Sequence, residues 1–352
     1  MDVDARNMCG HDVLFLDYDS QGCAMNLEYR SVSDAALALM REGHNNPDMC
    51  AILDAVAAEG VPPAPENSDG ETEDIGGLTV THRFVDAPGE SETLRWHFVE
   101  AGSGPTLVLM HGIPQSWHMW APILPELAKH FRCIAIDLKG YGQSDKRRGD
   151  YRHEGVAAQV VSLLDTIGVE DFHLFSHDRG SVQADFIAAS QGARVRRWVR
   201  GSQHLIHFHP DLAPQENLFT DLETRGILQD PMKMFQWGFG RLCKHPIPRE
   251  QVIRAVQEFS RPGTGLAVER YFQSSTFRKD WIDRRTRLVP AWQADILVLQ
   301  GSDEPPMPVE NYQGLEAYLP EVTVDFVDGG HFYVEENPAG TLEKALPFLT
   351  AD

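Results

Sequence analysis

The sequence predicts an α/β fold in which helices flank a mostly parallel sheet and a helical insertion lies over the strand ends. From Leu78 onward, short apolar segments alternate with segments of helical periodicity, which is typical of a parallel sheet wrapped by helices. Residues 106–110 form a continuous apolar run, as expected for a strand buried on both faces. The interval from about 204 to 290 breaks the alternation, and its Trp, Phe, Met and Pro content indicates an inserted helical cap.

The expected elements follow one another in chain order. Two antiparallel edge strands are expected at residues 78–84 and 94–99. The strands expected after them are residues 106–110, 133–136, 172–175, 195–200, 295–300 and 323–327. The helices expected among them are residues 123–129, 154–167, 182–189 and 339–348. This pattern divides the chain into a core of residues 76–203 and 291–352 and a cap of residues 204–290.

Residues 1–75 differ from the rest of the chain in charge. They contain sixteen Asp or Glu residues, three Arg and no Lys, so −13 of the net charge of −21 lies here. Residues 13–16 are apolar and predict a short strand or a buried turn. Residues 61–75 are rich in Pro and acidic side chains, which predicts a flexible linker.

Two helices are expected in this N-terminal extension. Ser33 is suited to cap a helix over residues 34–41 that Gly43 would end, and Asn46 precedes a second helix over residues 47–59. The apolar stripe of the second helix consists of Met49, Ile52, Leu53 and Val56. We expect a helical hairpin that docks on another surface, because so short a stripe cannot form its own core. The extension could order against its own domain, serve as the arm of a homodimer, or cover the active site.

The composition excludes several classes of partner. A net charge of −21 argues against nucleic acid and anionic membranes as partners. No run of about 18 apolar residues is present, so no transmembrane helix is expected. The acidic N-terminus lacks the apolar segment of a secretory signal. The five cysteines are odd in number and form no C-x-x-C pair, which favours a reduced, cytoplasmic protein.

The stretch from Phe172 to Ser181 predicts a strand, a tight turn and a helix. Ser176 and Gly180 are the small residues of a small-x-nucleophile-x-small pattern, which places Asp178 at the tip of a nucleophile elbow. A carboxylate at that tip attacks an sp3 carbon and forms an ester that water must then hydrolyse. The alternative interpretation of this stretch is a polar surface turn.

Four short motifs follow predicted strands, where open α/β sheets place their ligands. They are His111-Gly-Ile-Pro-Gln115, the stretch 137–145, the stretch 176–180 and Gly329-Gly-His-Phe332. Together they resemble the α/β-hydrolase superfamily, and more narrowly its aspartate-nucleophile branch of epoxide hydrolases and haloacetate dehalogenases. The resemblance covers roughly residues 78–350.

The resemblance implies a role for each motif. Asp178 would be the nucleophile, and His331 would take a proton from the water that cleaves the ester. The family's spacing, Gly-x-x-acid followed by Pro, selects Glu304 as the acid that orients His331, with Asp303 as the adjacent alternative. The backbone N–H groups of Ile113 and Arg179 would then form the oxyanion hole.

The cap is expected to supply donors for the leaving group. The indole N–H of Trp237 or the amide of Gln236 would bind a halide or an oxygen. Tyr271 resembles a cap tyrosine that donates its proton to an opening epoxide, whereas Phe235 stands near a position where epoxide hydrolases commonly have another tyrosine. These aromatic residues could instead simply fill the core. His111 is also expected to border the substrate.

The lack of an acid in the segment 200–203, after the strand that follows the elbow, departs from the haloacetate dehalogenases and, together with Glu304 and Tyr271, favours an epoxide hydrolase. A further departure is Val182, which stands where those enzymes have a second Arg beside the one at Arg179. A haloacetate dehalogenase is the alternative. A non-hydrolytic binding protein or biosynthetic cyclase on the same fold is a third hypothesis.

No cofactor is expected, and the partner expected is a small-molecule substrate. Neither G-x-G-x-x-G nor a P-loop is present, so nucleotide binding has no support. The histidines of the stretch 204–209, with Asp211 nearby, were considered as metal ligands, but a structural role at the cap hinge is favoured. We therefore predict no metal site.

Overall fold

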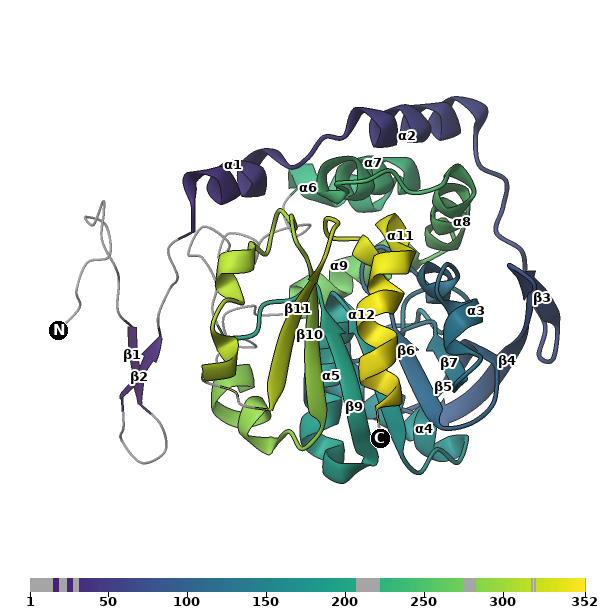
Figure 1. The fold of residues 1–352 in the computed structure, drawn as a ribbon. Coiled ribbons are helices and arrows are strands. Elements are labelled where there is room, and N and C mark those ends of the chain that lie inside the picture. Colours follow the sequence, from purple (N-terminus) through teal and green to yellow (C-terminus); the bar gives the residue numbers. More distant parts are fainter. Residues whose placement is uncertain are drawn as a thin grey trace.

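The computed structural model describes residues 15–18, 24–27, 32–206, 222–274, 283–317, 319 and 321–351. Within them, nine strands form one sheet in the order β11-β10-β9-β8-β6-β7-β5-β4-β3, and β1 pairs with β2 in a separate antiparallel ribbon. The six strands from β11 to β7 run parallel, whereas β5, β4 and β3 are antiparallel to their neighbours. Figure 1 shows the sheet between two layers of helices. The predicted α/β architecture is confirmed.

The elements lie close to their predicted positions. The strands are β1 Phe15–Tyr18, β2 Ala24–Leu27, β3 Thr72–Ile75, β4 Leu78–Pro88, β5 Thr93–Ala101, β6 Thr106–Met110, β7 Arg132–Ile136, β8 Phe172–His177, β9 Val195–Gly201, β10 Asp295–Gly301 and β11 Val322–Val327. The helices are α1 Asp34–Glu42, α2 Pro47–Glu59, α3 Leu124–Leu127, α4 His153–Thr166, α5 Arg179–Gln191, α6 Leu222–Leu228, α7 Pro231–Leu242, α8 Arg249–Phe259, α9 Thr264–Ser274, α11 Tyr333–Glu336 and α12 Pro338–Thr350. No helix in these residues is long and apolar enough to cross a membrane.

The position of strand β6 in the middle of the sheet explains why its sequence is continuously apolar. Leu107 and Leu109 belong to the hydrophobic cluster beneath α3 and α12, whereas Val108 and Met110 belong to the cluster beneath α4 and α5. Successive side chains of a strand point to opposite faces, so a strand covered on both faces needs an apolar residue at every position.

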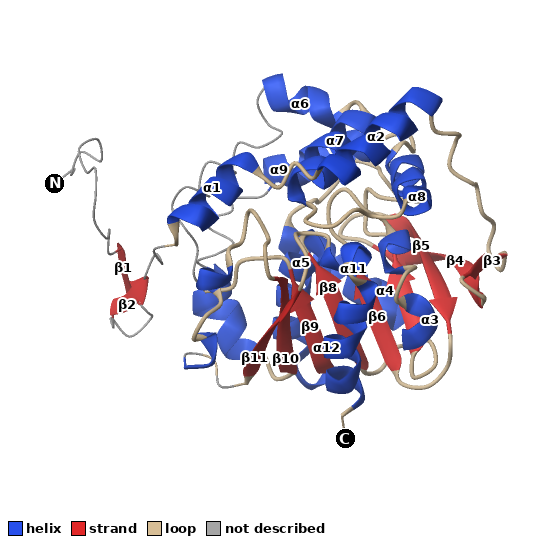
Figure 2. Ribbon diagram, turned by 45° about the horizontal axis from the view of Figure 1, so that its top comes forward, coloured by secondary structure: helices blue, strands red, loops and turns tan. Residues whose placement is uncertain are grey.

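Helices α6 to α9 lie over the carboxyl ends of the parallel strands (Figures 1 and 2). They follow β9 in the chain and precede β10, as predicted for an insertion at this point of the sheet. The floor of the resulting enclosure is formed by the loops that leave β6, β8, β10 and β11. These loops carry the predicted site motifs.

The N-terminal helices begin and end where the capping residues predict. The side chain of Ser33 accepts a hydrogen bond from the N–H of Ala36, and Asn46 caps α2 in the same way. The predicted hairpin is wrong, because α1 and α2 lie one after the other across the inserted helices (Figures 1 and 2). The buried residues of α2 pack on α7 and α8 rather than on α1, whose residues are all at least partly exposed.

Residues 61–75 are also not the flexible linker that their composition predicts. Thr72–Ile75 forms β3 and extends the main sheet beyond β4. Glu73 accepts a hydrogen bond from Arg254 of α8 at 2.9 Å, and Glu66 pairs with Arg261 at 2.8 Å. Two acidic side chains of this segment are thus paired with arginines of α8 and of the loop after it, which are distant in the sequence.

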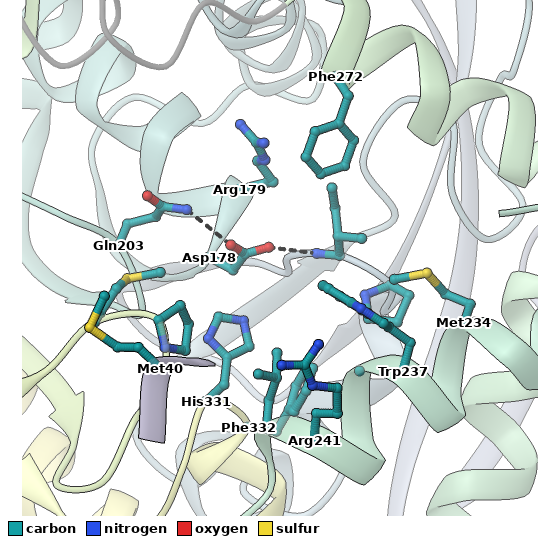
Figure 3. Close-up of a pocket in the computed structure, with 16 residues that line it drawn as sticks. Met40, Asp178, Arg179, Gln203, Met234, Trp237, Arg241, Phe272, His331 and Phe332 are labelled. Carbon is teal, nitrogen blue, oxygen red and sulfur yellow. Dashed lines mark hydrogen bonds between the residues drawn. The ribbon is translucent and has the colours of Figure 1, made fainter. Parts of the chain in front are cut away.

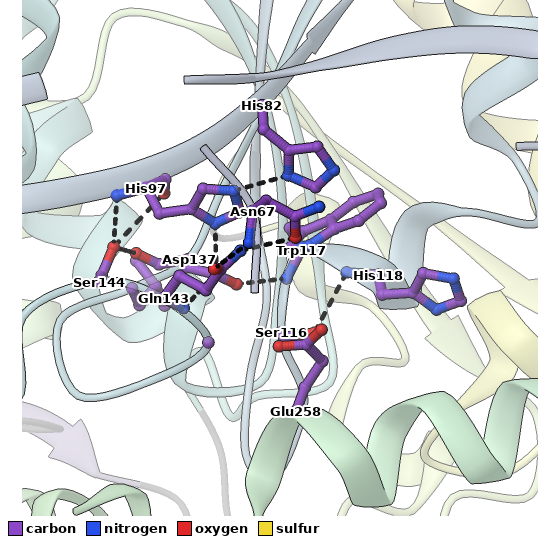
Figure 4. A network of polar contacts seen from close by, with 12 residues as sticks. Asn67, His82, His97, Ser116, Trp117, His118, Asp137, Gln143, Ser144 and Glu258 are labelled. Carbon is purple, nitrogen blue, oxygen red and sulfur yellow. Dashed lines mark hydrogen bonds and ion pairs between the residues drawn. The ribbon is translucent and has the colours of Figure 1, made fainter. Parts of the chain in front are cut away.

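A buried polar network ties the antiparallel edge to the loop after β7 (Figure 4). Asp137 accepts hydrogen bonds from His97 Nδ1 at 2.6 Å and from the backbone N–H groups of Trp117 and Gln143 at 2.9 and 2.8 Å. Nε2 of His97 contacts Nδ1 of His82 at 2.9 Å. Burial favours the neutral form of Asp137, but the nearby His97 and these donors together hold the pKa of the carboxyl below its usual range.

Candidate active site

The turn between β8 and α5 holds Asp178 in a strained conformation. Its φ of 47° and ψ of −119° are uncommon for a residue with a side chain. The turn is tight because α5 starts immediately, and a Cβ on Gly180 would lie 2.4 Å from the carbonyl oxygen of Met110. A small residue is therefore required at Gly180, as the elbow pattern predicts.

The carboxylate of Asp178 is held by one donor on each oxygen (Figure 3). The backbone N–H of Ile113 donates to Oδ2 at 2.9 Å, and Nε2 of Gln203 donates to Oδ1 at 3.0 Å. Burial alone would raise the pKa of Asp178, but the positive charges of His331 and Arg179 outweigh it, and the pKa lies below its usual range. The group is therefore an ionised, oriented carboxylate with little exposure to water.

His331 and Glu304 meet behind Asp178. Nδ1 of His331 lies 2.6 Å from Oε1 of Glu304, and the other carboxylate oxygen accepts a hydrogen bond from Ser202 at 3.2 Å. Burial would lower the pKa of His331, but the negative charges of Glu304 and Asp178 raise it above its ordinary value. The arrangement fixes the ring and favours a proton on Nδ1, which leaves Nε2 for proton transfer.

Asp303 has a different environment from its neighbour Glu304. Its carboxylate is partly exposed and accepts a hydrogen bond from Nζ of Lys244 at 2.6 Å. The structure thus brings Glu304, and not Asp303, to His331.

Asp178 and His331 border a cavity of about 220 Å³ between the sheet and the inserted helices. The cavity is lined by Met40, Ile113, Pro114, Asp178, Arg179, Gln203, Met234, Trp237, Gly238, Arg241, Leu242, Phe272, Pro306, Met307, His331 and Phe332. Most of these side chains are apolar, and the ionisable ones are Asp178, Arg179, Arg241 and His331 (Figure 3). A small pocket with few polar groups is the usual form of a site for a small ligand.

Arg179 and Trp237 both line this cavity. The guanidinium of Arg179 lies 4.6 Å from the centre of the Phe272 ring, and its Nη1 lies 2.9 Å from Nε2 of His153. Burial and the positive charge of Arg179 keep the pKa of His153 well below its ordinary value, so the neutral ring accepts this hydrogen bond.

Tyr271 does not reach the cavity, contrary to the prediction for a proton donor. Its hydroxyl donates to the carbonyl oxygen of Lys139 at 2.9 Å, and its ring packs against Tyr141 and Tyr151. Burial raises the pKa of the phenol far above its ordinary value. The neighbouring residue Phe272 lines the cavity instead, because consecutive residues of a helix point about 100° apart.

The same helical geometry corrects two predictions in α7. Trp237 lines the cavity, so its neighbours cannot share its direction. Gln236 is exposed and contacts Asp54 of α2 at 3.4 Å. Phe235 is fully buried, and its ring packs against that of Phe239.

His111 is likewise absent from the cavity wall. Its Nε2 accepts a hydrogen bond from the N–H of Leu138 at 3.0 Å, and its Nδ1 donates to the carbonyl of Gly112 at 2.8 Å. His111 therefore positions the loop that carries the Ile113 N–H, and it is not among the residues that line the cavity.

Among the wall residues that were not predicted are Gln203, Arg241 and Met40. Gln203 follows β9, in the segment 200–203 that lacks an acid. Arg241 lies four residues after Trp237 and so occupies the same face of α7, a relation that could have been noted from the sequence. Met40 comes from α1, and no sequence signal links it to the site.

The described residues contain no group of three His, Cys, Asp or Glu side chains that could hold a metal ion. In the histidine-rich stretch, His207 and His209 lie outside the described residues.

The chain belongs to the α/β-hydrolase fold family, whose model matches residues 105–338. It is 36% identical over 141 residues to bifunctional epoxide hydrolase 2 of Mus musculus, covering 39% of this chain and 25% of the mouse protein. It is 45% identical over 87 residues to fluoroacetate dehalogenase of a Burkholderia species, covering 23% of this chain and 29% of the relative. The chain thus matches these relatives over only about a quarter of their own length.

The fold resembles that of an epoxide hydrolase of Bacillus megaterium, with a TM-score of 0.62 and 19% identity. The likeness covers 76% of this chain and 99% of the other. At this identity the structural likeness establishes the fold alone. Together with the family match, it establishes the α/β-hydrolase fold of this chain.

Proposed function

We propose that the protein hydrolyses a bond at an sp3 carbon through a covalent ester on Asp178, without a cofactor. The observation that carries this proposal is the ionised, doubly hydrogen-bonded Asp178 carboxylate, which shares a cavity with a histidine backed by Glu304. A nucleophile, a base and a residue that orients the base are the parts that such a reaction requires.

In the first step, one oxygen of Asp178 attacks the carbon, and the leaving group departs with the electron pair of its bond. Ile113 and Gln203 hold the carboxylate with one oxygen each, which reduces its freedom before the attack. The inserted helices α6 to α9 act as a cap that limits access of water to the carboxylate.

In the second step, Nε2 of His331 takes a proton from water, and the resulting hydroxide adds to the ester carbonyl. The N–H groups of Ile113 and Arg179 stabilise the oxyanion. The carbonyl then reforms, the bond from the acyl carbon to the alkyl oxygen breaks, and the alcohol leaves with the proton from His331. Asp178 has no charge as an ester, so one cause of the raised pKa of His331 is lost and its neutral, basic form is favoured.

A halide is the leaving group that this cavity favours. An epoxide oxygen leaves as an alkoxide and needs a proton donor, and Tyr271 does not line the cavity. A halide needs only N–H donors, which Trp237 and Arg179 can offer. Epoxide opening is the second candidate, supported by the similarity to the mouse epoxide hydrolase.

The two-step reaction is tested by replacing His331 with Gln. This variant should still be alkylated, because Asp178 does the first step, and should then accumulate the ester. Intact-protein mass spectrometry after incubation with haloacids, alkyl halides or terminal epoxides should show a mass increased by the alkyl fragment. Halide release or diol formation by the wild-type enzyme identifies the leaving group.

The control is the double variant that also carries Asp178→Asn, which should form no adduct. An adduct of equal yield in the double variant would locate the alkylation elsewhere. No adduct in His331→Gln with a compound that the wild type hydrolyses would refute the covalent scheme.

A further inference from the structure

Arg241 is a cavity-lining cation held in place by the N-terminal extension. It lies in the last turn of α7, on the same face as Trp237, and its side chain is half-buried. Nη2 of Arg241 donates to the carbonyl oxygen of Arg41 at 2.8 Å. Among the described residues no carboxylate forms an ion pair with this guanidinium, which therefore has N–H donors to spare.

The extension fits closely around this end of α7. The backbone N–H of His44 donates to the carbonyl oxygen of Arg241 at 2.7 Å. Nε2 of the His44 ring lies 2.6 Å from the carbonyl oxygen of Asp303. Met40 contributes to the cavity wall itself. The extension therefore links the end of α7 to the loop that carries Glu304, and it fixes the position from which Arg241 enters the cavity.

The charges of the cavity wall do not cancel. Its ionisable side chains are Asp178, Arg179, Arg241 and His331. The carboxylate of Asp178 lies near His331 and accepts hydrogen bonds from Ile113 and Gln203. The wall therefore has one negative side chain and two guanidinium groups. In Figure 3 Arg179 and Arg241 lie on different sides of Asp178, and all three residues line the same cavity.

We propose that Arg241 is a specificity-determining residue that binds a carboxylate on the substrate while Asp178 attacks a nearby carbon. A guanidinium with unused N–H groups makes charge-assisted, often paired hydrogen bonds to carboxylates. A cation in the last turn would also stabilise α7, but that role does not require the side chain to line the cavity. The inference deepens the proposed function by naming the substrate class as a small carboxylic acid. The cavity volume sets the size limit, because it lies below the roughly 300–1,000 Å³ of common ligand pockets.

Binding of propionate and of propionamide to the full-length protein tests this proposal. The two compounds have nearly the same shape and differ in charge, and neither carries a leaving group. In NMR titrations at low salt, the wild type should bind propionate about 10- to 100-fold more tightly than propionamide. Arg241→Met should remove this preference and leave the affinity for propionamide unchanged, which also shows that the cavity is intact.

Arg249→Met is the matched control, because Arg249 joins the cap to Glu59 of the extension outside the cavity. This variant should keep the preference for propionate. Equal binding of both compounds to the wild type, or a preference that survives Arg241→Met, would overturn the proposal. Failure of the covalent mechanism would be recognised separately, because the His331→Gln adduct is sought with a compound that the wild type hydrolyses, whereas propionate and propionamide binding needs no reaction.

Discussion

At the scale of single residues, His331 has different electrostatic surroundings before and after the first step. In the free enzyme, Glu304 and the ionised Asp178 hold its pKa above the ordinary value of about 6.5. Ester formation removes the charge of Asp178. The pKa of His331 should therefore be lower in the ester than in the free enzyme.

This difference predicts the pH dependence of the reaction. The base form of His331 is lost as the pH falls through its pKa, so ester hydrolysis should slow in acid. Alkylation should persist to lower pH, because the pKa of Asp178 is itself depressed. In rapid-quench experiments the wild-type ester should accumulate at acidic pH. The midpoint of the acid limb of kcat should lie at a lower pH than the pKa of His331 measured by NMR in the free enzyme. A limb at or above that pKa would contradict the account.

The two acids after β10 provide a second prediction at this scale. Glu304→Gln should slow ester hydrolysis by about 10²- to 10⁴-fold, because the amide cannot stabilise the imidazolium of His331. Asp303→Asn should change the rate only slightly, since its carboxylate faces Lys244. Single-turnover rates of the two variants decide the assignment, and a collapse in Asp303→Asn alone would reverse it.

The sequence predicted the elbow around Asp178 and the turn that carries His331, because tight turns after buried strands require particular small residues. It did not predict which side of a helix faces the cavity. Trp237, Gln236 and Phe235 are adjacent, and all three were expected at the site. Only Trp237 lines the cavity, because the packing of the whole helix, rather than its local motif, sets its rotation.

At the scale of elements, the capping glycines of α1 and α2 offer a matched comparison. Gly43 and Gly60 both end a helix with positive φ, 73° and 77°. A Cβ on Gly43 would lie 2.6 Å from the carbonyl oxygen of Arg241, whereas a Cβ on Gly60 would meet nothing within 4 Å. The two sites therefore share the backbone strain and differ in the steric contact.

Gly43→Ala should consequently destabilise the docked extension more than Gly60→Ala, by about 1–3 kcal/mol. The expected result is faster hydrogen exchange across α1 and α2 in Gly43→Ala, with the core strands unchanged. Hydrogen-exchange mass spectrometry measures both regions at once. Equal exchange in the two variants would show that the contact between Gly43 and Arg241 does not hold the extension.

The strands and capped helices could be predicted because their signals are local. Apolar runs, Ser33 and Asn46 each act on a few neighbouring residues. The docking of the extension could not be predicted, because it depends on residues about 200 positions away. Glu73 was expected in a linker, yet its pairing with Arg254 and the register with β4 make that segment a strand.

At the scale of the whole molecule, the extension, the inserted helices and the sheet enclose one cavity. Each contributes to its wall: Met40 from the extension, Trp237 and Arg241 from the insertion, and Asp178 and His331 from the loops of the sheet. Such a site combines residues that are distant in sequence. A family resemblance limited to residues 78–350 could indicate the chemistry but not the contribution of the extension.

The covalent ester on Asp178 is the central claim, and a single turnover in water labelled with a heavy oxygen isotope tests it most directly. With enzyme in excess over a substrate that it hydrolyses, the product oxygen should come from Asp178 and be unlabelled. The heavy isotope should appear in the peptide that contains Asp178, as measured by mass spectrometry. Labelled product together with an unlabelled Asp178 peptide would show that water attacks the substrate directly, and would contradict the account.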